Sequence, residues 1–190
     1  PYSYHVLLYS LMIFFVGGLI ARKRLDLLIE AVARSTAPVI LDVYGPGDPS
    51  PFAFDEDKIC YRGTIPFGTT QKIVSQYDLL VLPSRYDGWG VVVNEALCAG
   101  VPVICSDQVG ARVLIEKFGA GVVFDSNDSG ALEAIISKLG SKPEHLLAMR
   151  AATRSAAQAI QPDVAAGYML AVLRAKPGDK SAVVSPWYPE

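Results

Sequence analysis

The sequence predicts an α/β fold, a doubly wound Rossmann-like parallel sheet of about six strands with helices on both faces and additional C-terminal helices. Short apolar runs rich in β-branched residues alternate with helical segments, which is the pattern of consecutive βαβ units. The composition, 51% hydrophobic and 19% charged, with a mean hydropathy of +0.31, is that of a chain with a buried core. At 190 residues, one domain buries roughly 70% of the surface of its unfolded chain and needs no disulfide or metal.

Six short apolar segments bounded by turn residues are expected to form strands. They are residues 11–16, 39–44, 59–62, 79–82, 101–105 and 122–124. Helices are expected between them at residues 24–34, 70–77, 91–99 and 112–117. The first of these helices places Leu25, Leu28, Ile29 and Val32 on one stripe, which predicts that this stripe packs on the sheet.

After the sixth strand the pattern becomes helical over residues 131–139 and 164–174. Between them, Ser141-Lys-Pro-Glu144 combines a capping box with an early proline, which predicts another helix start. We expect these helices to pack on the sheet or to cross to a neighbour. The domain is therefore expected over residues 11–175, followed by a C-terminal tail at residues 176–190.

The composition also excludes several classes of function. Seventeen Lys and Arg against nineteen Asp and Glu give a net charge of −2, which disfavours a nucleic-acid partner. Cys60, Cys98 and Cys105 have no C-x-x-C spacing, and the last two lie in apolar segments, so we expect reduced core residues. With two histidines in the chain, no metal site is expected. Residues 6–21 carry no charge but fall short of the roughly 20 residues of a membrane span, which favours a buried strand.

The loop after the first strand brings three cations to the start of a helix. Gly17 and Gly18 are followed by Arg22, Lys23 and Arg24. A cation at a helix N-terminus opposes the helix dipole by typically about 0.3–1 kcal/mol, and a bound phosphate would resolve that conflict. The alternatives are a solvated basic triplet and a plain strand-to-helix turn. The spacing matches neither G-x-G-x-x-G nor a Walker loop, which disfavours nicotinamide dehydrogenases and P-loop enzymes.

The loop after the fourth strand is the most informative segment. Asp87, Gly88, Trp89 and Gly90 lead into a helix that is apolar apart from Asn94 and Glu95, so the helix and its carboxylate are expected to be buried. A buried Glu95 needs hydrogen-bond donors, either the two hydroxyls of a ribose or a core salt bridge. Asp87 is expected to face the same cavity from a different depth, and its alternative role is a turn or cap residue.

Two further turns lie on the same edge of the predicted sheet. Gly45 follows the second strand, and Thr64 and Ile65 follow the third. Ordinary tight turns have the same composition. Their position beyond the carboxyl ends of the strands makes them candidates for contacts to a base or phosphate.

These segments together resemble the C-terminal, nucleotide-sugar-binding half of retaining family 4 glycosyltransferases with GT-B architecture, over about residues 14–124. The segment Phe15-Val-Gly-Gly-Leu-Ile-Ala-Arg-Lys23-Arg-Leu-Asp-Leu-Leu-Ile-Glu-Ala31 is similar to the V-G-R-L-x-x-x-K-G-x-D-x-L-I-x-A segment of the family. The turn from Val43 to Gly47 resembles its G-x-G turn. Asp87-Gly-Trp-Gly-Val-Val-Val-Asn-Glu95-Ala, followed by Gly100-Val-Pro-Val-Ile-Cys-Ser-Asp107, resembles its E-G-F-G-x-x-x-x-E-A and G-x-P-V-I-x-S-D block.

The resemblance implies a role for each matching residue. Lys23, assisted by Arg22 or Arg24, would hold the donor diphosphate, and Glu95 would bind the ribose. Asp87 would contact the transferred sugar, which the backbone of Gly88, Trp89 and Gly90 would approach. Thr64 and Ile65 would lie beside the base, and Gly17, Gly18 and Gly45 would belong to the same binding site.

Three features depart from the family pattern. Gly18 stands where many members have a phosphate-binding arginine, and Asp87 replaces the commoner glutamate. The segment from Gly47 to Ile59 is short, so the helix usual there is expected to be absent.

The resemblance further implies a donor that is a UDP- or GDP-linked sugar, a glycan or lipid-linked acceptor, retention, and no cofactor or metal. The chain begins with Pro1, so we expect a piece of a longer cytoplasmic protein, with residues 1–10 as the end of an interdomain linker. An N-terminal acceptor domain would be absent, and the fragment alone would bind donor without transferring sugar. A peripheral association with the inner face of the membrane is compatible with this picture. The alternatives are a nucleotide-sugar epimerase or hydrolase of the same architecture, and a degenerate domain that binds or scaffolds without catalysis.

Overall fold

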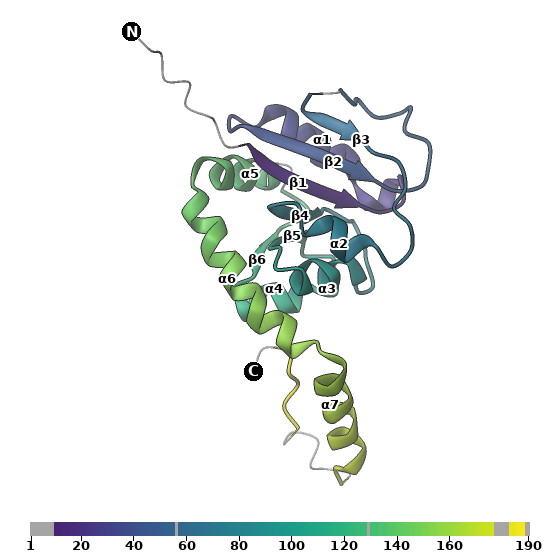
Figure 1. Cartoon of the computed structure of the whole chain (residues 1–190), viewed down its shortest axis with the longest axis vertical. Helices are drawn as coiled ribbons and strands as arrows, with labels where there is room; N and C mark the ends of the chain where they lie inside the picture. The colour runs from purple at the N-terminus through teal and green to yellow at the C-terminus, as the bar shows by residue number, and fades with distance from the viewer. Residues whose placement is uncertain (1–9, 56, 129, 177–182, 189–190) are drawn as a thin grey trace.

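The computed structural model in Figure 1 shows one parallel sheet flanked by helices, and it describes residues 10–55, 57–128, 130–176 and 183–188. The strands are β1 (Leu11–Val16), β2 (Val39–Tyr44), β3 (Ile59–Tyr61), β4 (Leu79–Leu82), β5 (Val103–Ser106) and β6 (Gly121–Phe124). The helices are α1 (Leu25–Arg34), α2 (Thr70–Val74), α3 (Val91–Cys98), α4 (Arg112–Phe118), α5 (Ala131–Ser141), α6 (Pro143–Ala159) and α7 (Pro162–Arg174), with a 3₁₀ turn at Ala21–Lys23 before α1. The predicted fold class is confirmed.

The sheet has the order β3-β2-β1-β4-β5-β6, and every pairing is parallel. The predicted bounds of β1, β2 and β4 are confirmed. The fifth strand begins later than predicted, at Val103, because the N–H of Val101 donates to the Ala96 carbonyl at the end of α3 and Pro102 has no N–H. Among the described residues between Gly47 and Ile59 there is no helix, in agreement with the short segment.

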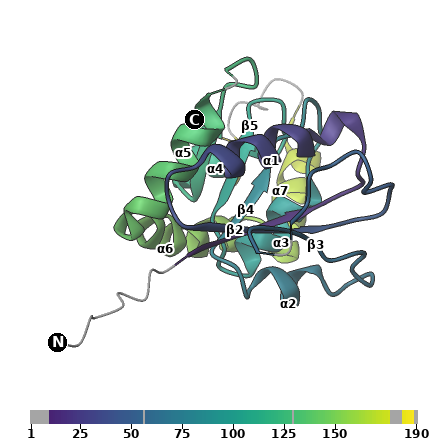
Figure 2. The same cartoon turned by 90° about the horizontal axis from the view of Figure 1, so that it is seen from above.

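Alternate strand residues face two separate cores, as expected for a sheet covered on both sides. Leu11, Ile13 and Phe15 of β1 pack with α1 and α5, whereas Phe14 packs with α3 and α4. Figure 2 shows α1 on one side of the sheet and α2 and α3 on the other. The predicted stripe of α1 is buried in the first of these cores.

Two predictions at helix ends need correction. The capping box at Ser141 does not form, because α5 continues to Ser141 and the Ser141 hydroxyl donates to the Ser137 carbonyl at 2.7 Å. Lys142 precedes α6 instead and makes no side-chain cap, although Pro143 does occupy the first turn. The second helix, α2, ends at Val74 rather than at Tyr77.

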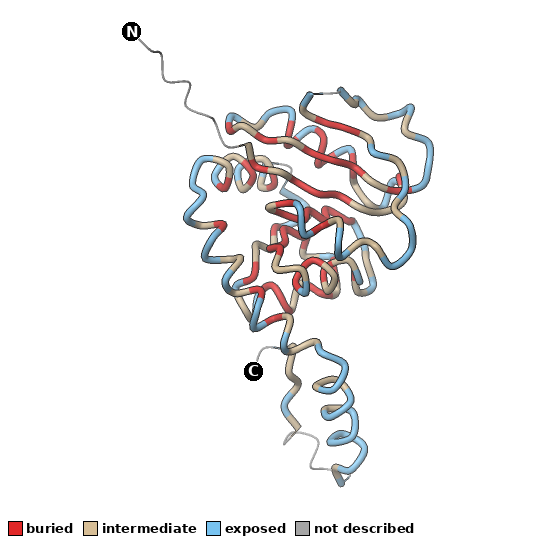
Figure 3. Tube along the Cα trace, viewed as in Figure 1, coloured by how far each residue is buried: buried red, intermediate tan, exposed pale blue. Residues whose placement is uncertain are grey.

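The C-terminal helices differ in their packing. α6 contacts α3, α4 and α5, whereas α7 has no buried residue. Figure 3 accordingly shows α7 as an exposed projection from the body of the domain. Within the described part of the chain, no helix is long and apolar enough to cross a bilayer. The predicted linker at residues 1–10 lies outside the described residues except for Ser10.

The three cysteines do not share one environment. Cys60 and Cys105 are buried, as expected for core residues, and burial raises the pKa of the Cys105 thiol to about 12. Cys98 is exposed at the end of α3. The prediction of a core position for Cys98 was therefore wrong.

Candidate functional site

The strand order reverses between β1 and β4, so the loops after these two strands flank a crevice at the carboxyl edge of the sheet. The structure ties the two loops together. The Arg85 N–H donates to the Arg22 carbonyl at 2.8 Å, and the Arg22 guanidinium donates to the Tyr86 carbonyl at 3.1 Å. Lys23 forms an ion pair with Asp87, and the two side chains are only 13% and 15% exposed. Arg22 and Lys23 are thus held against the loop that carries Asp87, whereas Arg24 pairs with Asp26 at 3.5 Å.

The loops after β1, β2 and β3 also converge. The Gly17 N–H donates to the Tyr44 carbonyl at 3.0 Å, and the Gly45 N–H donates to the Gly63 carbonyl at 2.8 Å. Gly45 has a φ of +147°, and a Cβ added there would lie 1.8 Å from the Gly17 carbonyl oxygen. The close approach of the first two loops therefore requires glycine at position 45.

A cleft of about 450 Å³, which we call the carboxyl-edge cleft, opens where these loops meet. It contains five residues that the sequence assigned to one binding site. They are Gly17, Gly45, Thr64, Ile65 and Glu95. The remaining lining residues are Val16, Pro46, Pro66, Phe67, Gly68 and Thr70. Backbone-rich turns, an apolar wall and one carboxylate form a surface suited to a base and a ribose.

Glu95 is the only carboxylate among the described residues that line the carboxyl-edge cleft. It is half-buried rather than buried, because α3 exposes one side: Val91 is 66% exposed. The expectation of a fully buried helix was therefore wrong. Burial still raises the pKa of the Glu95 carboxyl, while a hydrogen bond with the Thr70 side chain lowers it. Thr70 supplies one partner, and the opening of the cleft leaves the carboxylate accessible to a diol.

Lys23 lies next to this cleft, whereas Asp87 is directed toward Lys23. The carbons of the Lys23 side chain lie against Gly17, with Cε 3.6 Å from the position of a Cβ on that glycine. Asp87 is not among the residues that line the carboxyl-edge cleft. The expectation that Asp87 and Glu95 face one cavity is corrected accordingly, because the Lys23 ammonium attracts the Asp87 carboxylate.

The two glycines that follow Asp87 differ in their packing. Gly90 is buried with a φ of +88°, and a Cβ there would lie 3.1 Å from the side chains of Leu82 and Val109. Gly88 is exposed, and its carbonyl lies so close to Gly110 that a Cβ on Gly110 would lie 2.1 Å from the Gly88 oxygen. These contacts account for Gly90 and Gly110 without a ligand, whereas a Cβ on Gly88 itself would meet only the Tyr86 hydroxyl, at 3.8 Å.

The other predicted residues of the site are also placed. The Trp89 indole N–H donates to the Asn94 side-chain oxygen at 3.0 Å. Gly18 is open, with no atom nearer than 3.9 Å to the position of an added Cβ.

The sequence reasoning missed Thr70 and Phe67. Phe67 is fully exposed in the turn that forms one wall of the carboxyl-edge cleft. The Pro66-Phe-Gly-Thr turn is a detectable signal, because a large aromatic residue in a glycine-containing turn after a strand is difficult to bury.

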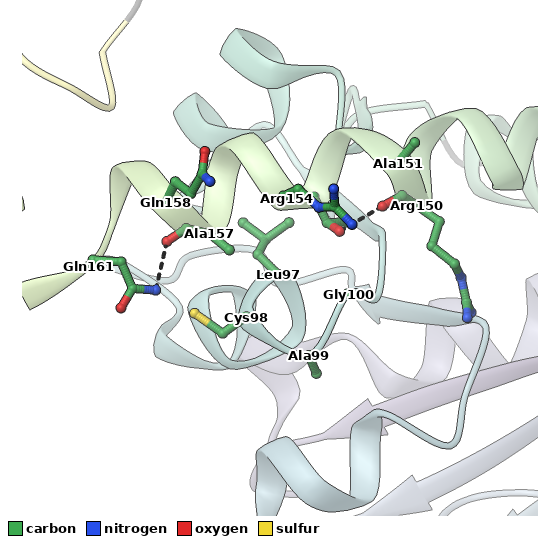
Figure 4. Close-up of a pocket in the computed structure, with 11 residues that line it drawn as sticks. Leu97, Cys98, Ala99, Gly100, Arg150, Ala151, Arg154, Ala157, Gln158 and Gln161 are labelled. Atoms are coloured by element: carbon green, nitrogen blue, oxygen red, sulfur yellow. Dashed lines mark hydrogen bonds between the residues drawn. The ribbon is translucent and has the colours of Figure 1, made fainter.

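A further cleft, of about 740 Å³, lies between the C-terminal end of α3 and α6. Figure 4 shows Cys98 and Gly100 on one side of it and Arg150 and Arg154 of α6 on the other. Because α3 starts at the carboxyl edge, its C-terminal end lies toward the opposite edge of the sheet. None of the binding-site residues that the sequence predicts lines this cleft.

The strand order and the joined loops define the class of the protein, a Rossmann-like domain with a cleft at the carboxyl edge of its sheet. The family model for glycosyl transferases group 1 matches residues 9–156, and the chain belongs to this family.

Among curated relatives, an uncharacterized glycosyltransferase of Methanocaldococcus jannaschii is 31% identical over 122 residues, 58% of this chain and 31% of the relative. The D-inositol 3-phosphate glycosyltransferase of Mycolicibacterium smegmatis is 29% identical over 155 residues, 76% of this chain and 36% of the relative. The chain thus spans about a third of the length of these relatives.

A similar fold occurs in S. aureus TarM, which was solved with UDP among its ligands. The TM-score is 0.74 and the sequence identity 21%, and the match covers 87% of this chain and 36% of that chain. This likeness supports the GT-B assignment of the fold.

Proposed function

We propose that this chain is the donor-binding half of a glycosyltransferase that moves a sugar from a UDP- or GDP-linked donor to a glycan or lipid-linked acceptor, with retention. The observation that carries the proposal is the carboxyl-edge cleft, in which Glu95, two glycines and the turn at Thr64 and Ile65 meet beside Lys23. The solved S. aureus neighbour binds UDP, which supports a nucleoside diphosphate as the ligand. The acceptor domain would be supplied by the rest of the protein, in a cytoplasmic location.

In the proposed reaction, the bond between the anomeric carbon and the diphosphate oxygen breaks, and the electron pair leaves with that oxygen. The acceptor hydroxyl oxygen forms the new bond to carbon, and its proton passes to the departing diphosphate oxygen. Lys23, with Arg22 nearby, would stabilise the charge on the departing diphosphate. Glu95 would hold the ribose. When the diphosphate displaces Asp87 from Lys23, the Asp87 carboxylate would be able to contact the transferred sugar. Because Lys23 and Arg22 would neutralise the diphosphate, the proposed reaction needs no metal.

A nucleotide-sugar epimerase or hydrolase would use the same donor cleft. Analysis of the products of the full-length protein separates these activities, because a transferase yields a new glycoside, a hydrolase a free sugar, and an epimerase an isomerised nucleotide sugar. A scaffold without donor affinity would give no heat with UDP, GDP or their sugar conjugates in calorimetry.

Substitution of Glu95 by glutamine tests the ribose contact. Loss of a charged acceptor for two hydroxyls is expected to weaken UDP or GDP binding about tenfold. Because burial raises the pKa of Glu95, wild-type affinity should fall on acidification already above the usual range of a glutamate, as the carboxylate is protonated. The Glu95→Gln variant should lack this pH dependence. Calorimetry at several pH values measures both effects, and equal pH profiles for the two proteins would contradict the assignment.

Substitution of Gly18 by arginine tests the departure from the family pattern. The position is open, and an added guanidinium would supply a charge-assisted hydrogen bond to the diphosphate. UDP affinity is expected to rise about fivefold to tenfold, whereas Gly18→Gln, of similar length without the charge, should leave it nearly unchanged. Equal affinities of the arginine and glutamine variants would show that no phosphate lies near this position.

A further inference from the structure

A third cleft lies beside the Asp87 loop and has aromatic walls. It encloses about 310 Å³ and is lined by Trp89, Asn94, Ile160, Ala165 and Trp187, and we call it the indole cleft. Its residues come from the loop after β4, from α3, from the end of α6, from α7 and from the described C-terminal segment. The fold therefore assembles this cleft from segments far apart in the chain.

Both indole rings are held in place before any ligand binds. The Trp89 N–H donates to the Asn94 Oδ1 at 3.0 Å. The Trp187 ring packs edge-on against Tyr168, with 5.2 Å between ring centroids and an interplanar angle of 72°. Fixed rings bind a ligand at a smaller entropic cost than mobile side chains do.

The segment that carries Trp187 is anchored as well. The Lys117 ammonium of α4 donates to the Ser185 carbonyl at 3.3 Å and to the Tyr188 carbonyl at 2.7 Å. Two hydrogen bonds on either side of Trp187 therefore hold this segment against the domain.

The lining of the indole cleft favours a neutral ring with one apolar face and a polar edge. None of its described lining residues carries a charge, and four of the five are apolar or aromatic. Asn94 accepts from Trp89 through Oδ1, which leaves its Nδ2 hydrogens able to donate to a hydroxyl oxygen. A pyranose presents C–H groups on one face and hydroxyls around its edge. The volume lies at the lower end of the range of about 300–1,000 Å³ for small-molecule sites, which suits a single ring.

Two residues of the indole cleft are close in sequence to residues of the proposed donor site. Trp89 follows Asp87 by two residues, and Asn94 directly precedes Glu95 on α3. We infer that the indole cleft binds a neutral sugar ring of the acceptor, stacked on Trp89 and Trp187 and oriented by Asn94. This inference rests on the proposed function and adds to it an acceptor subsite on the donor-binding half.

Tryptophan fluorescence of the whole chain provides the test, because the chain contains two tryptophans and both line this cleft. The probes are methyl α-mannopyranoside and methyl α-glucopyranoside, at millimolar concentrations. Cyclohexanol is the control for an apolar ring and glycerol the control for hydroxyls. We expect a saturable change in emission with at least one glycoside. The affinity for that glycoside should be at least fivefold higher than for either control. Trp187→Leu, read through the remaining Trp89, should weaken it at least fivefold.

Saturation-transfer NMR of the glycosides, which needs no fluorophore, checks the variants, and thermal melts establish that they are folded. Equal binding of cyclohexanol and the glycosides would overturn the proposal in favour of an apolar interface. The absence of any saturable change would also overturn the proposal. Calorimetry with UDP on the same samples separates the two proposals. Normal UDP binding without glycoside binding would reject the acceptor subsite alone, whereas glycoside binding without UDP binding would reject the donor site.

Discussion

Replacement of Gly45 by alanine is expected to destabilise the domain by about 3 kcal/mol or more. The residue has a φ of +147°, and the new Cβ would lie 1.8 Å from the Gly17 carbonyl oxygen. Since that oxygen belongs to backbone, no side-chain rotation relieves the clash, and the loops after β1 and β2 must separate. For a domain of this size the melting temperature should fall by about 6–12 °C.

The same substitution should remove nucleotide binding, because Gly17 and Gly45 both line the carboxyl-edge cleft. Gly18→Ala is the matched control. Its Cβ would meet nothing nearer than 3.9 Å, so its stability should stay within about 0.5 kcal/mol of the wild type. Thermal melts and UDP calorimetry of both variants check the prediction. A Gly45→Ala protein that melts with the control and binds UDP normally would contradict the proposed convergence of the two loops.

The sequence predicted the sheet well because parallel strands buried on both faces are short apolar runs, and Leu11–Val16, Val39–Tyr44 and Leu79–Leu82 are such runs. Topology then accounts for most of the site. Once β1 and β4 are neighbours, the loops after them must meet at one edge, so the proximity of Lys23 and Asp87 follows from strand order.

Side-chain directions could not be predicted in the same way. The helix at Val91–Cys98 is apolar almost all round, so no periodicity indicates which face is exposed, and Cys98 was wrongly placed in the core. The pairing of Asp87 with Lys23 depends on which of the nearby charged groups interacts most strongly with the carboxylate in the folded domain. Likewise, buried Asp42 is held by Arg62 at 2.9 Å and Tyr77 at 2.7 Å, two residues distant in the sequence.

The Lys23–Asp87 pair makes the other large prediction, because two substitutions should move binding in opposite directions. Lys23→Met removes the cation and is expected to weaken UDP binding about tenfold to a hundredfold, the range of a charge-assisted hydrogen bond. Asp87→Asn removes the carboxylate that competes with the diphosphate for Lys23, so UDP binding should tighten about fivefold. Both variants leave one mostly buried charge without its partner, and both should lose about 1–3 kcal/mol of stability.

This opposition separates a ligand-binding cation from a purely structural ion pair. If the pair served the fold alone, each variant would lower stability, and the two substitutions would not change UDP affinity in opposite directions. Uridine is the matched ligand, since it lacks the diphosphate. Its affinity should be unaffected by Lys23→Met, yet should fall in Glu95→Gln, which acts on the ribose. Calorimetry with UDP and uridine on the three variants makes the comparison. Equal weakening of UDP and uridine binding by Lys23→Met would mean that Lys23 does not contact the diphosphate. The diphosphate could then not be placed beside Gly17.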